Sequence, residues 1–308
     1  MKIAICLLLV VCLAFASHPV NKEIVEEIKR STNLWWPVET EENIFKFHDE
    51  AQITAMLGAK IDQDRDRKVA SEMGVLNFDE ESDITTPAEF DSREAWTMCP
   101  FDIKDQGQCG SCWAFGAVET LEDRICIQSQ GEFTADLSEQ NMVACDWVGF
   151  GCSGGFPISA FGYLSIMGVP TEECVPYTSG QSGEAWGCSY KCEDSSVSSK
   201  RYRCEYPWIN FTNSGIKKEI AARGPAETAF SVYEDFINYK GGIYHHTTGG
   251  MLGGHAVKIV GWGVEEGVNY WIVANSWSTS WGEDGYFRIK EGDSGFASSA
   301  YSCTPYAY

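Results

Sequence analysis

The ten residues QGQCGSCWAF, which begin at Gln106, constrain this chain more than any other stretch. They place the thiol of Cys112 before a segment with apolar residues at steps of three and four, which predicts an amphipathic helix from Trp113 to about Gln128. A thiol in the first turn of a helix lies among unpaired backbone N–H groups at the positive end of the helix dipole, which stabilises the thiolate. The run therefore predicts a reactive cysteine, with the Gln106 amide as a donor to an oxyanion.

A thiolate nucleophile needs a base partner, which need not be near in sequence. His255 follows Cys112 by 143 residues in the strand-like run GGHAVKIVGWG. Asn275 follows 20 residues later, and its amide can fix the orientation of the imidazole. Trp277 is placed to shield that hydrogen bond from water, which strengthens it. The alternative, that Cys112 is half of a disulfide in a secreted binding module, does not account for this matched set.

Five motifs spread over residues 87–289 resemble those of the papain family of cysteine peptidases, and within it the cathepsin B-like members. They are QGQCGSCWAFGAVE, GCSGG, GPAETAFSVYEDF, GGHAVKIVGWG and NSWSTSWGEDGYF. The resemblance implies Cys112 as the nucleophile and His255 as the acid/base. It also implies Asn275 as the residue that orients the imidazole and Gln106 as an oxyanion-hole donor. The implied activity is endopeptidase hydrolysis through a thioester acyl-enzyme, with no metal and no cofactor. The alternative is a catalytically silent binding protein on the same scaffold, and the intact set of four residues counts against it.

The coarse pattern indicates an α+β protein. Apolar spacing around residues 138–143 and 157–167 joins the helix after Cys112 in a helical first half, and the second half is strand-rich. The resemblance implies a papain-like two-lobe fold, with a helical left lobe, a β-barrel-like right lobe and an active-site cleft between them. Cys112 would lie on the helical wall and His255 on the barrel wall.

The resemblance also implies which residues bind substrate. They are Gly154, Gly155, Phe156, Pro157, Ala229, Ala256, Trp277 and Ser299. The two glycines would pair with the substrate backbone, although a simple turn after Cys152 is the alternative. Ser299 stands where cathepsin B has an acidic residue that lets the pocket for the residue two before the cut accept arginine. We therefore expect this pocket to prefer bulky apolar side chains.

The primed side of the cleft departs from the family pattern. Cathepsin B carries a long occluding loop with a histidine pair that receives the C-terminal carboxylate of a substrate. The matching stretch, residues 175–187, is short and contains no histidine, lysine or arginine. Because a carboxylate receptor needs a cation, we expect an endopeptidase that lacks the carboxydipeptidase activity of cathepsin B.

The N-terminus predicts the compartment. Residues 1–16 combine Lys2, an apolar run and the small-x-small sequence Ala14-Phe15-Ala16, which predicts a cleaved signal peptide. The apolar run is too short to span a bilayer, although an uncleaved anchor is the alternative. We therefore expect a non-membrane protein of the secretory pathway that is destined for a lysosome or vacuole or is secreted.

Residues 17–86 lack the motifs and are rich in charge and in apolar clusters. The pattern of Trp36 followed by Asn43-Ile44-Phe45 resembles the short propeptide of the cathepsin B-like members. The segment is therefore predicted to be an inhibitory propeptide that precedes a mature peptidase domain at residues 87–308, with an exposed processing site in the acidic stretch 79–83. A small extra domain is the alternative, but this length without cysteines is marginal for independent folding.

Cysteine usage agrees with an oxidising compartment. Of 13 cysteines, Cys6 and Cys12 leave with the signal peptide and Cys112 is assigned to catalysis, so 13 − 3 = 10 remain. An even number in a secreted chain favours disulfides over metal binding. By resemblance the pairs are Cys99–Cys126, Cys109–Cys152, Cys145–Cys188 and Cys174–Cys192. The resemblance does not extend to Cys204 and Cys303, which could pair with each other.

The formal net charge of −21 argues against nucleic acid as a partner. The expected partners are peptide and protein substrates, the chain's own propeptide and cystatin-like inhibitors, with the enzyme acting as a monomer. Asn210-Phe211-Thr212 is an N-glycosylation sequon, so a glycoprotein is expected. The Gly/Ser-rich stretches at 178–183 and 195–199 are predicted to be surface loops.

Overall fold

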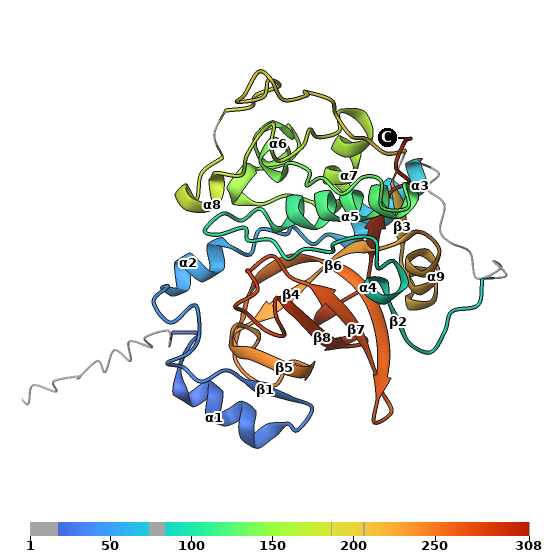
Figure 1. Ribbon diagram of the computed structural model, residues 1–308. Helices are drawn as coiled ribbons and strands as arrows, with labels where there is room; N and C mark the ends of the chain where they lie inside the picture. Colours follow the sequence, from blue (N-terminus) through green and yellow to red (C-terminus); the bar gives the residue numbers. More distant parts are fainter. Residues whose placement is uncertain (1–17, 74–83, 186, 206, 308) are drawn as a thin grey trace, which may run out of the picture.

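The computed structural model describes residues 18–73, 84–185, 187–205 and 207–307. The chain forms two lobes, one of helices and one built on a curved sheet (Figure 1). The predicted signal peptide at 1–16 and the predicted processing site at 79–83 lie outside the described residues. Within those residues, no helix is long and apolar enough to span a membrane.

Helix α5 (Cys112–Gln128) is the central element of the helical lobe and confirms the predicted helix. The prediction that it is amphipathic is wrong, because every residue from Cys112 to Cys126 is buried. Its acidic side chains meet lysines from distant parts of the chain instead of solvent. The Nζ atom of Lys258 lies 2.7 Å from the Asp123 carboxylate and 3.2 Å from that of Glu119. The polar stripe of α5 is therefore paired inside the molecule.

Three further helices complete this lobe, and the first two were expected from the apolar spacing. They are α6 (Glu139–Cys145), α7 (Pro157–Ile166) and the one-turn α8 (Ser179–Ser182), with a 3₁₀ turn η1 (Gly151–Ser153) between α6 and α7. Helices α6 and α7 pack on α5 around an apolar cluster that includes Val118, Leu121 and Phe161. The surface loop predicted at 178–183 is partly wrong, since Ser179 is buried in α8.

The second lobe is a strand-rich layer that wraps around its own core. Within the described residues its nine strands follow the order β1-β5-β8-β7-β6-β4-β9-β3, with β2 paired to β6. The bounds are β1 (Trp35–Pro37), β2 (Phe90–Asp91), β3 (Trp208–Asn210), β4 (Ala226–Tyr233), β5 (Tyr239–Tyr244), β6 (Met251–Glu265), β7 (Val268–Ala274), β8 (Tyr286–Lys290) and β9 (Ala300–Ser302). Helices α4 (Ser92–Ala95) and α9 (Asn213–Arg223) and the turns η2 (Phe236–Asn238) and η3 (Asp293–Gly295) flank it. The two-lobe α+β prediction is confirmed.

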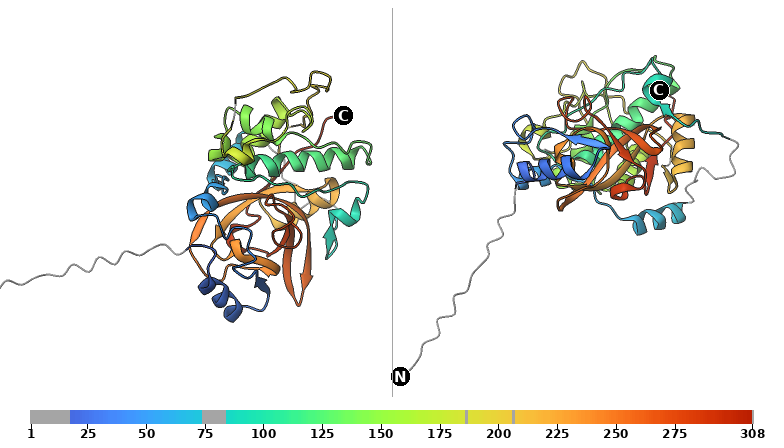
Figure 2. Two further views of the ribbon diagram at one scale, coloured as in Figure 1. Left: turned by 60° about the vertical axis from the view of Figure 1, so that its left-hand side comes forward. Right: turned by 90° about the horizontal axis from the view of Figure 1, so that it is seen from below.

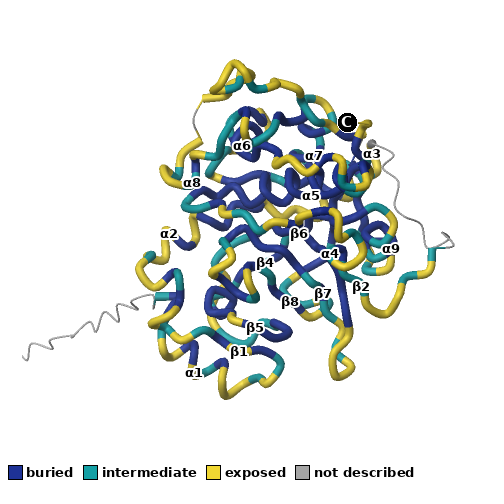
Figure 3. Tube along the Cα trace, in the orientation of Figure 1, coloured by how far each residue is buried: buried dark blue, intermediate teal, exposed yellow. Residues whose placement is uncertain are grey.

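Residues 18–73 wrap around the outside of both lobes through α1 (Lys22–Ser31), β1, α2 (Glu50–Ala55) and α3 (Gln63–Met73) (Figure 2). Asn21 caps the N-terminus of helix α1, since its side chain accepts the backbone N–H of Ile24. Strand β1 adds to the sheet by antiparallel pairing with β5. The outward faces of α1 and α2 are exposed, whereas α5 and the sheet are buried (Figure 3). This N-terminal segment is thus an added layer over a core that the rest of the chain forms.

Five disulfides join the described residues. All four of the pairs that the resemblance implied are present, and Cys204 bonds to Cys303 across 99 residues. Among the described cysteines, only Cys112 has a free thiol. This pattern matches a chain folded in an oxidising compartment.

The structure argues against the predicted glycosylation at Asn210. That residue lies in β3 and is only 3% exposed. A glycan is bulky and belongs on the surface, so one on this side chain is incompatible with the packing of β3 in the folded chain. The sequon was visible in the sequence, but its burial depends on the pairing of β3 with β9.

Candidate active site

The predicted nucleophile begins helix α5. The Cys112 side chain is fully buried, and backbone N–H groups of Ala256, Gly58 and Trp113 face its sulfur. Despite these donors, burial raises the pKa of the Cys112 thiol to about 11. In this state of the chain the sulfur is therefore a protonated thiol, kept from water by the residues that cover it.

The predicted base and its orienting partner come from neighbouring strands, because β6 carries His255 and Asn275 directly follows β7. The Nε2 atom of His255 lies 2.7 Å from Oδ1 of Asn275. That Oδ1 also accepts the Ser276 backbone N–H, so it is an acceptor and His255 Nε2 carries the proton. The Nδ1 atom of His255 makes no hydrogen bond within the described structure and has its lone pair available.

The environment of His255 is apolar. The indole of Trp277 stacks on the imidazole with 4.6 Å between ring centroids, as the sequence suggested. Burial lowers the pKa of His255 to about 4, although its bond to Asn275 acts in the opposite direction. Ala256, the next residue along β6, packs against Cys112, which places the predicted base and nucleophile on facing walls.

The predicted oxyanion donor Gln106 is held by Ser276. The hydroxyl of Ser276 donates to Oε1 of Gln106 at 2.7 Å, and the Gln106 backbone N–H donates to the Ser276 carbonyl at 2.9 Å. This fixes the amide so that Nε2 donates to the carbonyl oxygens of Met56, at 2.8 Å, and Cys109, at 2.7 Å. The Met56 carbonyl of the N-terminal segment thus accepts the hydrogen bond that Gln106 Nε2 was predicted to donate to an oxyanion.

The N-terminal segment crosses directly over Cys112. The Gly58 carbonyl accepts the Gly155 N–H at 2.9 Å, and the Lys60 N–H donates back to the Gly155 carbonyl at 2.8 Å. The Ala59 N–H donates to the Gly254 carbonyl at 3.0 Å. Gly155, predicted to pair with a peptide backbone, does so here with the chain's own residues.

Close approach at this crossing depends on glycine. A Cβ atom on Gly58 would lie 1.8 Å from the carbonyl oxygen of Gly110, and one on Gly154 would lie 2.2 Å from that of Gly58. Gly154 also has a φ of +106°, a backbone conformation that side chains disfavour. The predicted role of Gly154 is therefore compatible with a backbone contact and not only with a turn.

The walls of the predicted side-chain pocket meet beside Cys112. Ala229 on β4 lies opposite Ala256 on β6, and both pack with Cys112 and Ala59. Pro157 is buried at the first position of α7. Ala229, Ala256 and Cys112 form one apolar surface, which Ala59 of the N-terminal segment touches.

Helix α3 covers the other side of this pocket. The Arg65 guanidinium lies 3.7 Å from the centre of the Phe156 ring. Asp66 accepts a hydrogen bond from the Tyr301 hydroxyl, which is 2.8 Å from the Ser299 hydroxyl. Phe156 and Ser299, both predicted to line the pocket, therefore contact the N-terminal segment.

Glu227 and Tyr301 lie near this pocket but were not among the predicted site residues. Glu227 is fully buried, and neither oxygen of its carboxyl has a hydrogen-bond partner in the described structure. Burial first, and then the nearby Glu119, raise its pKa well above the usual value, which favours the neutral form. Tyr301 lies opposite Glu227 on the neighbouring strand β9. The alternation of AETAF places Glu227 and Ala229 on one face of β4, which was the available signal.

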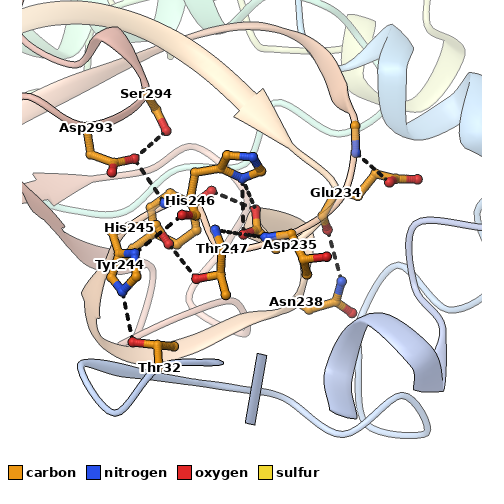
Figure 4. A network of polar contacts seen from close by, with 12 residues as sticks. Thr32, Glu234, Asp235, Asn238, Tyr244, His245, His246, Thr247, Asp293 and Ser294 are labelled. Carbon is orange, nitrogen blue, oxygen red and sulfur yellow. Dashed lines mark hydrogen bonds and ion pairs between the residues drawn. The ribbon is translucent and has the colours of Figure 1, made fainter. Parts of the chain in front are cut away.

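A second polar network anchors the N-terminal segment (Figure 4). Thr32 Oγ1 lies 2.8 Å from Nε2 of His245, and the Trp35 indole donates to the His245 carbonyl at 3.1 Å. The buried Asp235 accepts the Tyr244 hydroxyl at 2.7 Å. It also accepts the backbone N–H groups of Thr247 and Thr248, which fixes the turn after His246. His245 is therefore partly covered by the N-terminal segment.

The described residues contain no group of three or more His, Cys, Asp or Glu side chains arranged to hold a metal ion. The chemistry available at the site is that of a thiol, an imidazole and an amide donor. Two facing lobes with a thiol on one wall and an Asn-bonded imidazole on the other define the site of a cysteine protease.

Comparison with known proteins gives the family. Residues 86–304 match the model of the papain family of cysteine proteases, and the chain belongs to that family. It is 43% identical over 249 residues to cathepsin B-like cysteine proteinase 6 of Caenorhabditis elegans, a match that covers 70% of this chain and 65% of that protein. It is 37% identical over 307 residues to a cathepsin B-like cysteine proteinase of Schistosoma japonicum, covering 89% and 87%.

A solved structure shows the same architecture. The procathepsin B S9 of Trypanosoma congolense superposes with a TM-score of 0.85 at 32% identity and covers 94% of this chain and 99% of that one. The chain is therefore a cathepsin B-like member of the papain family.

Proposed function

We propose that this chain is a cysteine endopeptidase made as a zymogen. The free thiol of Cys112 at the start of α5, beside the His255–Asn275 pair, is the observation that carries this function. Hydrolysis of a fluorogenic peptide by the processed chain, lost when Cys112 is alkylated, tests it. Persistence of hydrolysis after complete alkylation would contradict it.

The proposed mechanism starts from the free thiol of Cys112 and the unbonded Nδ1 atom of His255. His255 Nδ1 takes the proton of Cys112, since Nε2 is bonded to Asn275, and the resulting thiolate attacks the peptide carbonyl carbon. The oxyanion is held by the Cys112 backbone N–H and Gln106 Nε2. As the C–N bond breaks, Nδ1 gives its proton to the leaving amine. Water, deprotonated by the same imidazole, then cleaves the thioester and regenerates the thiol.

Residues 17–86 are proposed to be the inhibitory propeptide, residues 87–308 the mature enzyme and residues 1–16 a signal peptide. Two contacts support inhibition: Met56 occupies the Gln106 donor, and Gly58 presents an N–H to the sulfur. A peptide group that offers its N–H, and not its carbonyl carbon, is not placed for attack.

Five disulfides support a route through the secretory pathway, to a lysosome or vacuole or to the outside. A monomer open to cystatin-like inhibitors is also proposed.

The processed enzyme is expected to show little carboxydipeptidase activity. Residues 175–187 contain no cation, so a substrate's free C-terminal carboxylate has no partner there. A matched pair of peptides, one ending in a free carboxylate two residues after the cut and the other in an amide, should be cleaved at similar rates. Sequential release of C-terminal dipeptides at a rate rivalling internal cleavage would refute this.

The pocket for the residue two before the cut is expected to prefer Leu, Val or Phe over Arg by at least roughly tenfold in specificity constant. Its proposed walls are apolar except for Ser299, and a buried guanidinium without a carboxylate partner costs about 1–3 kcal/mol or more. Fluorogenic substrates with Phe-Arg or Arg-Arg before the reporter measure the ratio. Equal turnover of Arg-Arg, abolished by Glu227→Gln, would show instead that Glu227 ionises and reaches the pocket.

A further inference from the structure

The shortened segment that follows Cys174 lies directly against the turn carrying Gln106. The Gln108 backbone N–H donates to the Gly180 carbonyl at 2.8 Å. Gly107 has a φ of +56°, and a Cβ atom there would lie 2.5 Å from the same carbonyl oxygen. The two backbones are therefore in contact without intervening side chains.

The hydroxyl of Tyr177 bridges the two ends of this turn. It donates to the Gln106 carbonyl at 2.8 Å and lies 2.8 Å from the Ser111 hydroxyl. Because the single phenolic proton goes to Gln106, the Ser111 hydroxyl donates to the Tyr177 oxygen. Ser111 occupies the N-cap of α5 but makes no side-chain cap bond, which leaves its hydroxyl for this contact.

Both proposed oxyanion donors belong to this turn. Gln106, whose Nε2 is one donor, is at its start, and the backbone N–H of Cys112, the other donor, directly follows its end. Ser276 holds the side chain and the N–H of Gln106, and Tyr177 holds its carbonyl. Oxyanion donors act only when they are fixed in advance within about 0.5 Å. The hydrogen bond from Tyr177 to the Gln106 carbonyl is therefore expected to affect catalysis.

Tyr177 is itself held firmly. Its backbone N–H donates to Oε1 of Glu172 at 2.6 Å, and its ring packs edge-on against Phe115 with 4.9 Å between centroids. The next residues are fixed too, since Gln140 Oε1 accepts the backbone N–H groups of Thr178, at 2.9 Å, and Ser179, at 3.0 Å. The phenol therefore reaches the turn from a rigid support.

Given the proposed role of Gln106 as an oxyanion donor, on which this inference rests, we propose that Tyr177 is a positioning residue of the oxyanion hole. Its hydroxyl sets the distance between Gln106 Nε2 and the Cys112 N–H. The short segment that replaces the occluding loop thereby supports acylation.

Tyr177→Phe removes both hydrogen bonds and keeps the ring. In the processed enzyme, kcat for an amide substrate should fall about five- to tenfold with KM little changed, less than the roughly 10²–10³ that loss of a donor itself costs. Alkylation of Cys112 by iodoacetamide should keep its rate and pH profile, because displacement at a saturated carbon forms no oxyanion. A general disturbance of the start of α5 would slow both reactions.

Two further variants make the outcome decisive. Tyr163→Phe, at a buried tyrosine of α7 whose hydroxyl donates to Asn141, should leave both rates unchanged. Gln106→Ala should lower hydrolysis more than Tyr177→Phe does. If Gln106→Ala is fully active, the proposed role of Gln106 fails. If Gln106→Ala is impaired but Tyr177→Phe keeps its kcat, or loses hydrolysis and alkylation in parallel, the inference about Tyr177 is overturned while the proposed function stands.

Discussion

Replacing Cys112 by alanine is expected to reduce peptide hydrolysis by the processed enzyme by on the order of 10⁴–10⁶. Cys112 is the only free thiol among the described cysteines, and the rest of these are committed to disulfides, so no second nucleophile of this kind is available. His255→Ala should cost nearly as much, because residues that act as one unit lose function non-additively. Asn275→Ala should cost less, since its Oδ1 orients the imidazole without reacting.

The measurement is the initial rate on a fluorogenic amide substrate at mildly acidic pH. Unchanged thermal unfolding of each variant separates a lost catalytic group from a lost fold. Substantial hydrolysis by Cys112→Ala, purified free of wild-type enzyme, would contradict the assignment of the nucleophile. An Asn275→Ala variant as inactive as His255→Ala would show that the amide does more than orient the ring.

The motifs around Cys112 and His255 could be interpreted from the sequence because their chemistry depends on local neighbours. A thiol before a helical pattern and an imidazole in a glycine-flanked strand keep these features wherever the lobes meet. The burial of α5 could not be predicted in the same way. Its acidic stripe looks solvent-facing until Lys258, more than a hundred residues later, is placed against Asp123. Long-range charge pairing of this kind has no local signature.

The path of the N-terminal segment could not be predicted from the sequence either. Its resemblance to a propeptide suggested an inhibitory segment, but no motif marked Gly58 or Met56 as the residues at the nucleophile. Their positions follow from where β1 joins the sheet and where α2 ends, which are tertiary contacts. Tyr177 could not be identified either, since the sequence marked its stretch only by shortness and by the absence of cationic side chains.

Gly58→Ala is expected to open the zymogen. The new Cβ would lie 1.8 Å from the Gly110 carbonyl oxygen, and Gly110 cannot retreat. Its N–H donates to the Cys152 carbonyl at 3.0 Å, and its neighbour Cys109 is bonded to Cys152. The N-terminal segment must therefore move away. Overpacking of a rigid site costs about 1–3 kcal/mol, which corresponds to roughly 5- to 150-fold more of the open state.

Labelling of Cys112 by iodoacetamide in the unprocessed full chain, at neutral pH, measures this opening. The thiol is fully buried in the closed state, so reaction passes through the open one, and its rate follows the open population when closing is fast. We expect Gly58→Ala to raise the rate by that same roughly 5- to 150-fold factor. Once the segment has been removed, Gly58→Ala and the original chain should label at the same rate, because residue 58 is then absent.

Gly162→Ala is the matched control. Gly162 lies in α7, where an added Cβ meets no atom within 4 Å, so the same chemical change should leave labelling unchanged. Faster labelling in both variants would indicate a general loosening of the chain, and equal rates in Gly58→Ala and the original chain would show that the crossing tolerates a side chain. Either result would contradict the claim that steric contact with Gly110 requires glycine at residue 58. A rise confined to Gly58→Ala would show that backbone contact with Gly110 holds the segment over Cys112.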